Sequence, residues 1–130
     1  MQKIIEELLK KIMDKETFPT PEDPGEVNLN SIEIVNSYIR EADSNSFNLE
    51  FYIVFKFQIP KRDETKFGLA SIRFMNDAVE SMSKTFSKND IKPINYNLVQ
   101  SGNDTRDIYK KIERISEVFE DIKQVDIAKC

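Results

Sequence analysis

The clearest pattern in the chain is a strict alternation that runs from Phe47 to Ile59. Every second residue of this segment is apolar, and mostly polar residues lie between them. Alternation with a period of two predicts a β-strand that places one face in a core. At roughly 3.3 Å per residue the strand spans roughly 43 Å, whereas most strands have only about 3–10 residues. We therefore expect it to outrun its own core, as part of a hairpin that protrudes toward a neighbouring subunit.

The residues before this strand predict a helix, a loop and another strand. Apolar residues recur at spacings of three and four from Ile4 to Ile12, which is typical of an amphipathic helix. Three prolines within residues 18–25 then predict an extended loop. Val27 to Arg40 is rich in β-branched and aromatic residues and predicts a strand, with a bulge near Asn30 and Ser31 that reconciles its two apolar faces. The composition of residues 41–46 predicts a turn.

The segment from Asp63 to Phe86 predicts a second helix. Asp63 or Thr65 can cap its first turn. Its apolar residues form one stripe at helical spacing, made of Phe67, Ala70, Phe74, Ala78 and Met82. After a break at residues 87–90, Ile91 to Val99 predicts another strand, in which Pro93 indicates the start or an edge position.

The last segment has the spacing of a helix, although a strand remains open. The turn from Ser101 to Asp104 precedes it, and Asp104 or Thr105 can cap a helix there. Spacings of four and three separate its apolar residues, which are Ile108, Ile112, Ile115, Phe119, Ile122 and Val125. In a strand the same residues would scatter over both faces, so the pattern favours the helix.

Length and composition fit one small domain that covers residues 1–130. The net charge of −4 argues against a general nucleic-acid binder, and we expect no sequence-specific nucleic acid among its partners. No apolar run approaches the ~20 residues that span a bilayer, so we expect no membrane contact. The acidic residues near the N-terminus do not fit a signal peptide, and the lone Cys130 cannot form an internal disulfide. We therefore expect the chain to begin in a cytoplasm.

The chemical inventory argues against an enzyme. The chain contains no histidine, which is the commonest general base and the commonest metal ligand. Cys130 is the last residue, and nothing is fixed near it that would lower its pKa. Glycine-rich phosphate loops and calcium-loop patterns are absent from the sequence. We expect no catalytic residues, no metal site and no cofactor, and we expect the protein to act by binding other proteins.

Two surfaces are candidates for a subunit interface. One is the second face of the alternating strand, with Glu50, Tyr52, Val54 and Lys56. The other is the apolar line of the last segment, with Ile115, Phe119 and Ile122, which acidic residues flank. An amphipathic segment at the end of a chain usually packs in the core, and binding to a partner subunit is the alternative for this last segment.

The order of elements resembles that of the tail terminator, or tail-completion, proteins of tailed bacteriophages and phage-tail-like particles. The similar parts are the hairpin that ends in Phe51-Tyr52-Ile53-Val54-Phe55-Lys56-Phe57, the helix after Lys61-Arg62-Asp63, and the Ser101-Gly102-Asn103-Asp104 turn before a charged last segment. The resemblance covers nearly the whole chain and rests on its length and element order.

This resemblance implies an α+β fold, an antiparallel sheet with a long hairpin and helices packed on one face. The order would be helix–strand–strand–helix–strand, followed by a strand or a helix. It also implies a non-enzymatic virion protein, assembled in the bacterial cytoplasm, that forms a hexameric ring. The ring terminates the tail tube, so its partners are copies of itself, tail tube or sheath proteins and neck proteins. The family usually ends in a strand, and the helical spacing of the last segment departs from that.

A monomeric adaptor or regulatory binding module of a bacterial cytoplasm is the alternative. Its docking element would be the acidic last segment, from Asp107 to Cys130. A site built from carboxylates alone is a third reading and would make the chain an enzyme.

Overall fold

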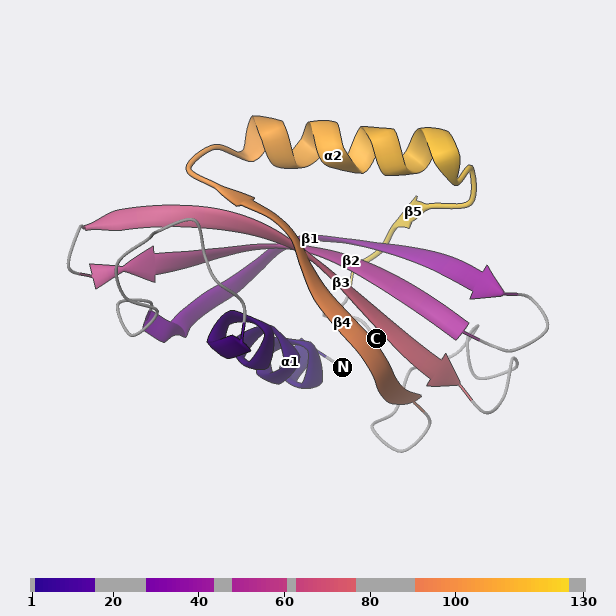
Figure 1. The fold of residues 1–130 in the computed structure, drawn as a ribbon, viewed down its shortest axis with the longest axis horizontal. Coiled ribbons are helices and arrows are strands. Elements are labelled where there is room, and N and C mark those ends of the chain that lie inside the picture. The colour runs from indigo at the N-terminus through magenta and orange to yellow at the C-terminus, as the bar shows by residue number, and fades with distance from the viewer. Residues whose placement is uncertain (1, 16–27, 44–47, 61–62, 77–90, 127–130) are drawn as a thin grey trace.

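A computed structural model describes residues 2–15, 28–43, 48–60, 63–76 and 91–126. These residues form a five-stranded antiparallel sheet and two helices (Figure 1), which confirms the α+β class. The strand order is β4-β3-β2-β1-β5. In chain order the elements are α1 (Gln2–Lys15), β1 (Asn28–Asp43), β2 (Asn48–Ile59), β3 (Glu64–Asn76), β4 (Ile91–Gly102), α2 (Thr105–Val118) and β5 (Lys123–Gln124).

The alternating strand is β2, at the centre of the sheet. It pairs antiparallel with β1 on one side and with β3 on the other. All five residues from Phe51 to Phe55 are at most 6% exposed, so both faces of this part of the strand are covered. The strand prediction is confirmed. The second face, which the sequence suggested as a subunit interface, is covered by α2 at Tyr52 and Val54.

Strand β1 follows the predicted pattern, and its irregularities explain its mixed alternation. The register with β2 shifts between Asn28 and Glu33, which confirms the bulge predicted near Asn30 and Ser31. A further shift lies between Ile34 and Asn36. Because the extra residue reverses which side later residues face, Ile34 and Ile39 both pack on the α1 side of the sheet.

The predicted helix from Asp63 to Phe86 is wrong over Glu64–Asn76, which form β3. This strand pairs without interruption with β2, from Ile59↔Glu64 to Asn48↔Met75, and also with β4. Asp63 is a turn residue with a φ of 50°, and its backbone N–H donates to the Pro60 carbonyl. Residues 77–86 of the predicted helix lie outside the described residues.

The physical reason for this error is that β3 carries buried apolar residues on both faces. Ala70 and Ile72 point toward α1, whereas Leu69 points toward α2, and all three are fully buried. A strand with two covered faces has no polar alternation, so its apolar residues also fit helical spacing. The segment forms a strand because it pairs with β2 on one side and with β4 on the other.

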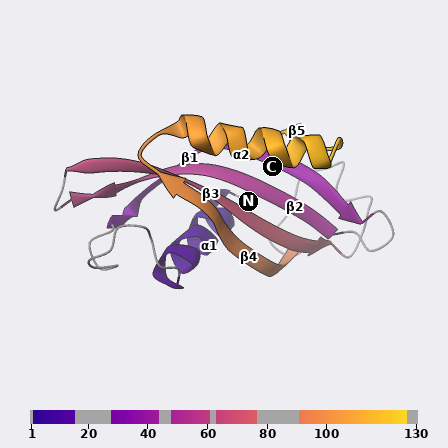
Figure 2. The ribbon, with the colours of Figure 1, turned by 45° about the horizontal axis from the view of Figure 1, so that its top comes forward.

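The two helices cover opposite faces of the sheet (Figures 1 and 2). Helix α1 packs its Ile5, Leu9 and Ile12 in a cluster with Phe51, Ile53 and Phe55 of β2. Helix α2 packs Ile108 and Ile112 in a second cluster with Tyr52, Val54 and Leu69. Successive residues of a strand point to opposite faces, so the helices lie on opposite sides, and the expectation of both on one face is wrong.

The C-terminal part confirms several predictions. Strand β4 contains Pro93 and lies at the edge of the sheet, as expected for proline. The helix predicted for the last segment is confirmed from Thr105 to Val118, and the Asp104 side chain accepts a hydrogen bond from the Arg106 backbone N–H. It is wrong from Phe119 to Val125, because the backbone is already extended at Phe119. The helix then ends, and the two-residue strand β5 pairs with Tyr38 and Ile39 of β1.

The turn predicted at residues 41–46 is wrong over 41–43, because β1 continues to Asp43 and pairs there with β2. Other predictions fall outside the described residues: the loop at 18–25, the second half of that turn at 44–46 and the role of Cys130. Neither of the two described helices is long and apolar enough to cross a membrane.

Candidate interaction surface

A polar cluster centred on Glu50 ties three strands together on the α2 side of the sheet. Glu50 lies on β2 and is 8% exposed. Its Oε2 lies 3.2 Å from Arg40 Nη1 on β1 and 3.6 Å from Arg73 Nη2 on β3. Its Oε1 accepts a 3.0 Å hydrogen bond from the Ser71 hydroxyl. Both carboxylate oxygens are therefore occupied, and the group serves as a cross-strand link.

Tyr52 belongs to the same cluster and stays protonated at neutral pH. Burial, followed by the charge of Glu50 and a hydrogen bond to it, raises the pKa of the Tyr52 hydroxyl to about 12. A phenol with that pKa donates a hydrogen bond and does not act as a base near neutral pH.

The residues after α2 are held against β1. The Arg40 guanidinium lies 3.5 Å from the centre of the Phe119 ring, and its Nε lies 3.9 Å from Asp121. The Val125 backbone N–H donates to the Ser37 carbonyl at 2.9 Å, and the Ser37 hydroxyl donates to the Val125 carbonyl. These contacts fix the C-terminal end of α2 over the outer part of the sheet.

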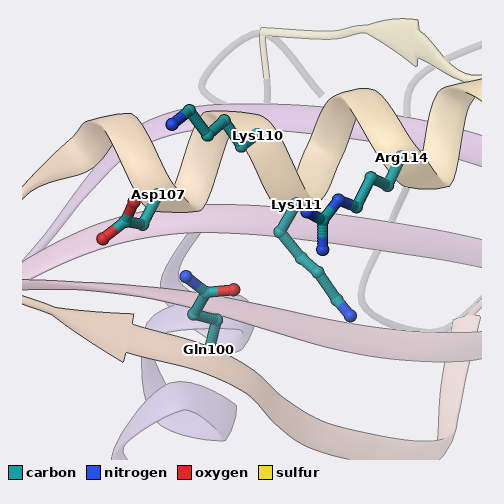
Figure 3. A pocket seen from close by; sticks show the side chains of 5 residues that line it. All are labelled: Gln100, Asp107, Lys110, Lys111 and Arg114. Carbon is teal, nitrogen blue, oxygen red and sulfur yellow. The ribbon is translucent and has the colours of Figure 1, made fainter.

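Two hollows flank α2, one toward each side of the sheet. The hollow toward β4 has a volume of about 150 Å³ and is lined by Gln100, Asp107, Lys110, Lys111 and Arg114. In Figure 3, Gln100 points from β4 toward the helix, and Lys111 reaches from the helix down toward the strands. We call Lys110, Lys111 and Arg114 the basic flank.

The hollow toward β1 differs in both size and chemistry. Its volume is about 450 Å³, and it is lined by Tyr38, Tyr109, Ile112, Glu113, Ser116 and Glu117. Two tyrosine rings form part of its wall, and the two carboxylates are exposed. Burial, and then the neighbouring Tyr109, raise the pKa of the Tyr38 hydroxyl. We call Glu113 and Glu117 the acidic flank.

The structure places the predicted interface residues on one face of the molecule, around α2. Tyr52 and Val54 are buried beneath the helix, and Ile115 and Ile122 pack against the same cluster. Glu50 is buried on the same side of the sheet, between Arg40 and Arg73. Lys56 pairs with Glu33 at 3.0 Å and is partly exposed. Phe119 lies under Arg40. The two surfaces that the sequence suggested separately are thus one surface, whose apolar part is packed inside the chain.

The sequence reasoning noted the acidic residues of the last segment but missed the basic flank. The signal was present, because Arg106, Lys110 and Arg114 follow one another at intervals of four. Such residues share one side of a helix. Among the described residues no group of three or more acidic, histidine or cysteine side chains could hold a metal ion.

Comparisons with family models, with curated proteins and with solved structures found no match to this chain.

Proposed function

We propose that this chain is a non-enzymatic structural protein of a phage or phage-like tail, which forms a ring that terminates the tail tube and joins it to the neck. The resemblance in element order motivates the proposal. The observation that carries it is that the molecule has two unlike sides, one at β4 and one at β1. A ring needs this property, because each copy must use one surface to contact a different surface of the next.

The outer strands give this arrangement further support. Among the described residues β4 pairs only with β3, and β5 covers β1 only at Tyr38 and Ile39. Strands β1, β2 and β3 also reach beyond α1 in both directions (Figure 1). We propose that the outlying part of the long hairpin contributes to contacts between subunits.

The test is the mass of the particle in solution, by size-exclusion chromatography with light scattering, followed by electron microscopy. We expect a closed ring, with six copies as the resemblance implies, alone or with tail tube and neck proteins. A chain that stays monomeric at high concentration and binds none of these proteins would contradict the proposal. A gene position between those of the capsid connector and the tail tube would support it.

The alternative, a monomeric adaptor, has the open hollow beside Tyr38 and Tyr109 in its favour, since a partner could dock there. Deleting Asp107 to Cys130 would not test it, because α2 covers Tyr52, Val54 and Leu69. Substituting the exposed Glu113 and Glu117 leaves that core intact. If the chain is an adaptor, the wild type is monomeric, and these substitutions abolish its binding to a different protein.

A further inference from the structure

Most charged side chains of helix α2 are divided between its two sides, although the acidic Asp107 also lines the hollow of the basic flank. The basic flank faces β4 and the acidic flank faces β1. Lys110 and Arg114 are four residues apart, as are Glu113 and Glu117, so each flank places like charges one turn apart. Opposite charges also lie three residues apart on this helix, at Lys110 and Glu113 and at Arg114 and Glu117, and such a spacing stabilises a helix. Among the described residues, no ion pair includes a side chain of the basic flank or of the acidic flank.

The two flanks also lie over opposite sides of the sheet. The basic flank shares its hollow with Gln100 of β4, the edge strand, and the acidic flank shares its hollow with Tyr38 of β1. Two copies placed side by side in one orientation would therefore bring the basic flank of one toward the acidic flank of the next.

The acidic hollow has the chemistry that recognises a long cationic side chain. Carboxylates form charge-assisted hydrogen bonds with a guanidinium or an ammonium group, and tyrosine rings attract the same cations through their faces. The 450 Å³ hollow combines both kinds of group. Lys111 and Arg114 are side chains of the matching kind, and Lys111 reaches out from its helix (Figure 3).

We propose that copies of this chain associate head to tail, with Lys111 and Arg114 of one copy contacting Glu113, Glu117 and the tyrosine-lined hollow of the next. The proposal rests on the proposed function and names its subunit contact. The contact joins two different surfaces, so repeating it leads to a ring when the rotation between copies closes.

Two charge-reversal variants test this contact. Lys111→Glu with Arg114→Glu makes both proposed contact surfaces acidic while Lys110 stays unchanged, and Glu113→Lys with Glu117→Lys makes both of them basic. Three of these side chains are exposed and Lys111 is partly so, hence both variants should fold, which circular dichroism checks. We expect each variant alone to associate more than about tenfold more weakly than the wild type, because like charges then meet.

Mixing the two variants is the decisive measurement. Every contact between unlike variants again joins opposite charges, so light scattering should show alternating assemblies of wild-type size. A single chain that carries all four substitutions should also regain association. Rising salt should weaken the wild-type contact, because the flanks are solvent-accessible. Lys3→Glu with Lys11→Glu is the control for the reversal of Lys111 and Arg114, since it makes the same change of net charge at exposed positions of α1 on the opposite face.

The possible failures separate the contact from the function. Variants that assemble like the wild type would overturn the contact and leave a ring assembled through other surfaces. If only reversal of the basic flank mattered, that flank would bind a different acidic partner, and the contact would again be overturned. A wild-type chain that stays monomeric overturns the contact, and it overturns the proposed function too if tail tube and neck proteins do not bind it.

Discussion

At the scale of single residues, the centre of the sheet depends on the space that Gly68 leaves for Phe55. These residues pair directly across β2 and β3, and a Cβ built on Gly68 would lie 2.5 Å from Cζ of the Phe55 ring. We expect Gly68→Ala to lower the free energy of unfolding by about 1–3 kcal/mol, as measured in urea, because the ring must shift.

Gly102→Ala is the matched control for this prediction. Nothing lies within 4 Å of its Cβ position, so we expect a change within about 0.5 kcal/mol. Equal losses of stability at the two glycines would show that the Phe55 ring is not the reason why alanine is unfavourable at Gly68.

Glu50 is the residue on which the polar cluster depends. Glu50→Gln removes the charge shared by Arg40 and Arg73, and losing one partner of a buried pair typically costs about 3–5 kcal/mol. We expect a loss near the lower end of that range in urea denaturation, because Arg73 is 40% exposed. Glu33→Gln breaks the exposed pair with Lys56 and should cost less than about 1 kcal/mol. A comparable loss in both variants would contradict the structural role given to Glu50.

Tyr52 makes stability depend on pH in the alkaline range. Its pKa is raised from an ordinary value of 10.0 to about 12, so the folded state holds the phenol proton more tightly than the unfolded state. The resulting stabilisation is complete below about pH 10 and is lost as the pH rises toward 12. Denaturation at a series of pH values should show a steeper loss in the wild type than in Tyr52→Phe. Parallel curves for the two proteins would rule out this effect.

At the scale of elements, the sequence predicts a segment well when its two faces differ. The apolar stripe of α1 and the alternation of β2 have one dominant period each, and both elements appear as expected. Strand β3 has Ala70 and Ile72 on one face and Leu69 on the other, all buried. Because buried apolar residues lie on both of its faces, no regular alternation marks it, and pairing with β2 and β4 identifies it as a strand.

The cap of α2 supplies an element-scale prediction. The Asp104 side chain accepts a hydrogen bond from the Arg106 backbone and pairs with its guanidinium at 2.7 Å, and these contacts lower the pKa of the Asp104 carboxyl. We expect Asp104→Ala to lower the urea midpoint of unfolding, because the first turn of α2 loses its capping hydrogen bond. Asp104→Asn keeps the cap and loses only an exposed ion pair, so it should be close to neutral. A large loss in the asparagine variant would assign the stabilisation to the ion pair.

At the scale of the whole molecule, the sequence leaves the placement of the helices open. Each helix has one apolar stripe, but a stripe does not say which face of a sheet it covers. Tyr52 and Val54 indicate the answer, because two apolar residues on the second face of β2 require a second helix on that face of the sheet. The basic flank escaped notice for a similar reason, since its place beside Gln100 depends on how α2 lies over β4.

Assembly predicts a stability that depends on protein concentration. Association that requires the folded state raises the midpoint of thermal unfolding as the concentration rises. We expect this rise for the wild type, and we expect it to disappear when Lys111 and Arg114 are both changed to Glu. Differential scanning calorimetry over a range of concentrations measures it. A midpoint that is independent of concentration in the wild type would argue for a monomer.

The burial of β2 on both faces has a consequence for the chain before it has folded. Phe51 to Phe55 is an uncharged run of aromatic and β-branched residues without proline or glycine, the composition from which amyloid-like stacks form. No position within it can carry a solubilising charge, because each one is buried in the native sheet. The charges of Glu50 and Lys56 stand directly at its two ends, where gatekeeper residues limit aggregation. During synthesis β2 emerges before β3, β4 and α2. The charges of Glu50 and Lys56 therefore oppose its stacking on other chains while these elements do not yet cover it.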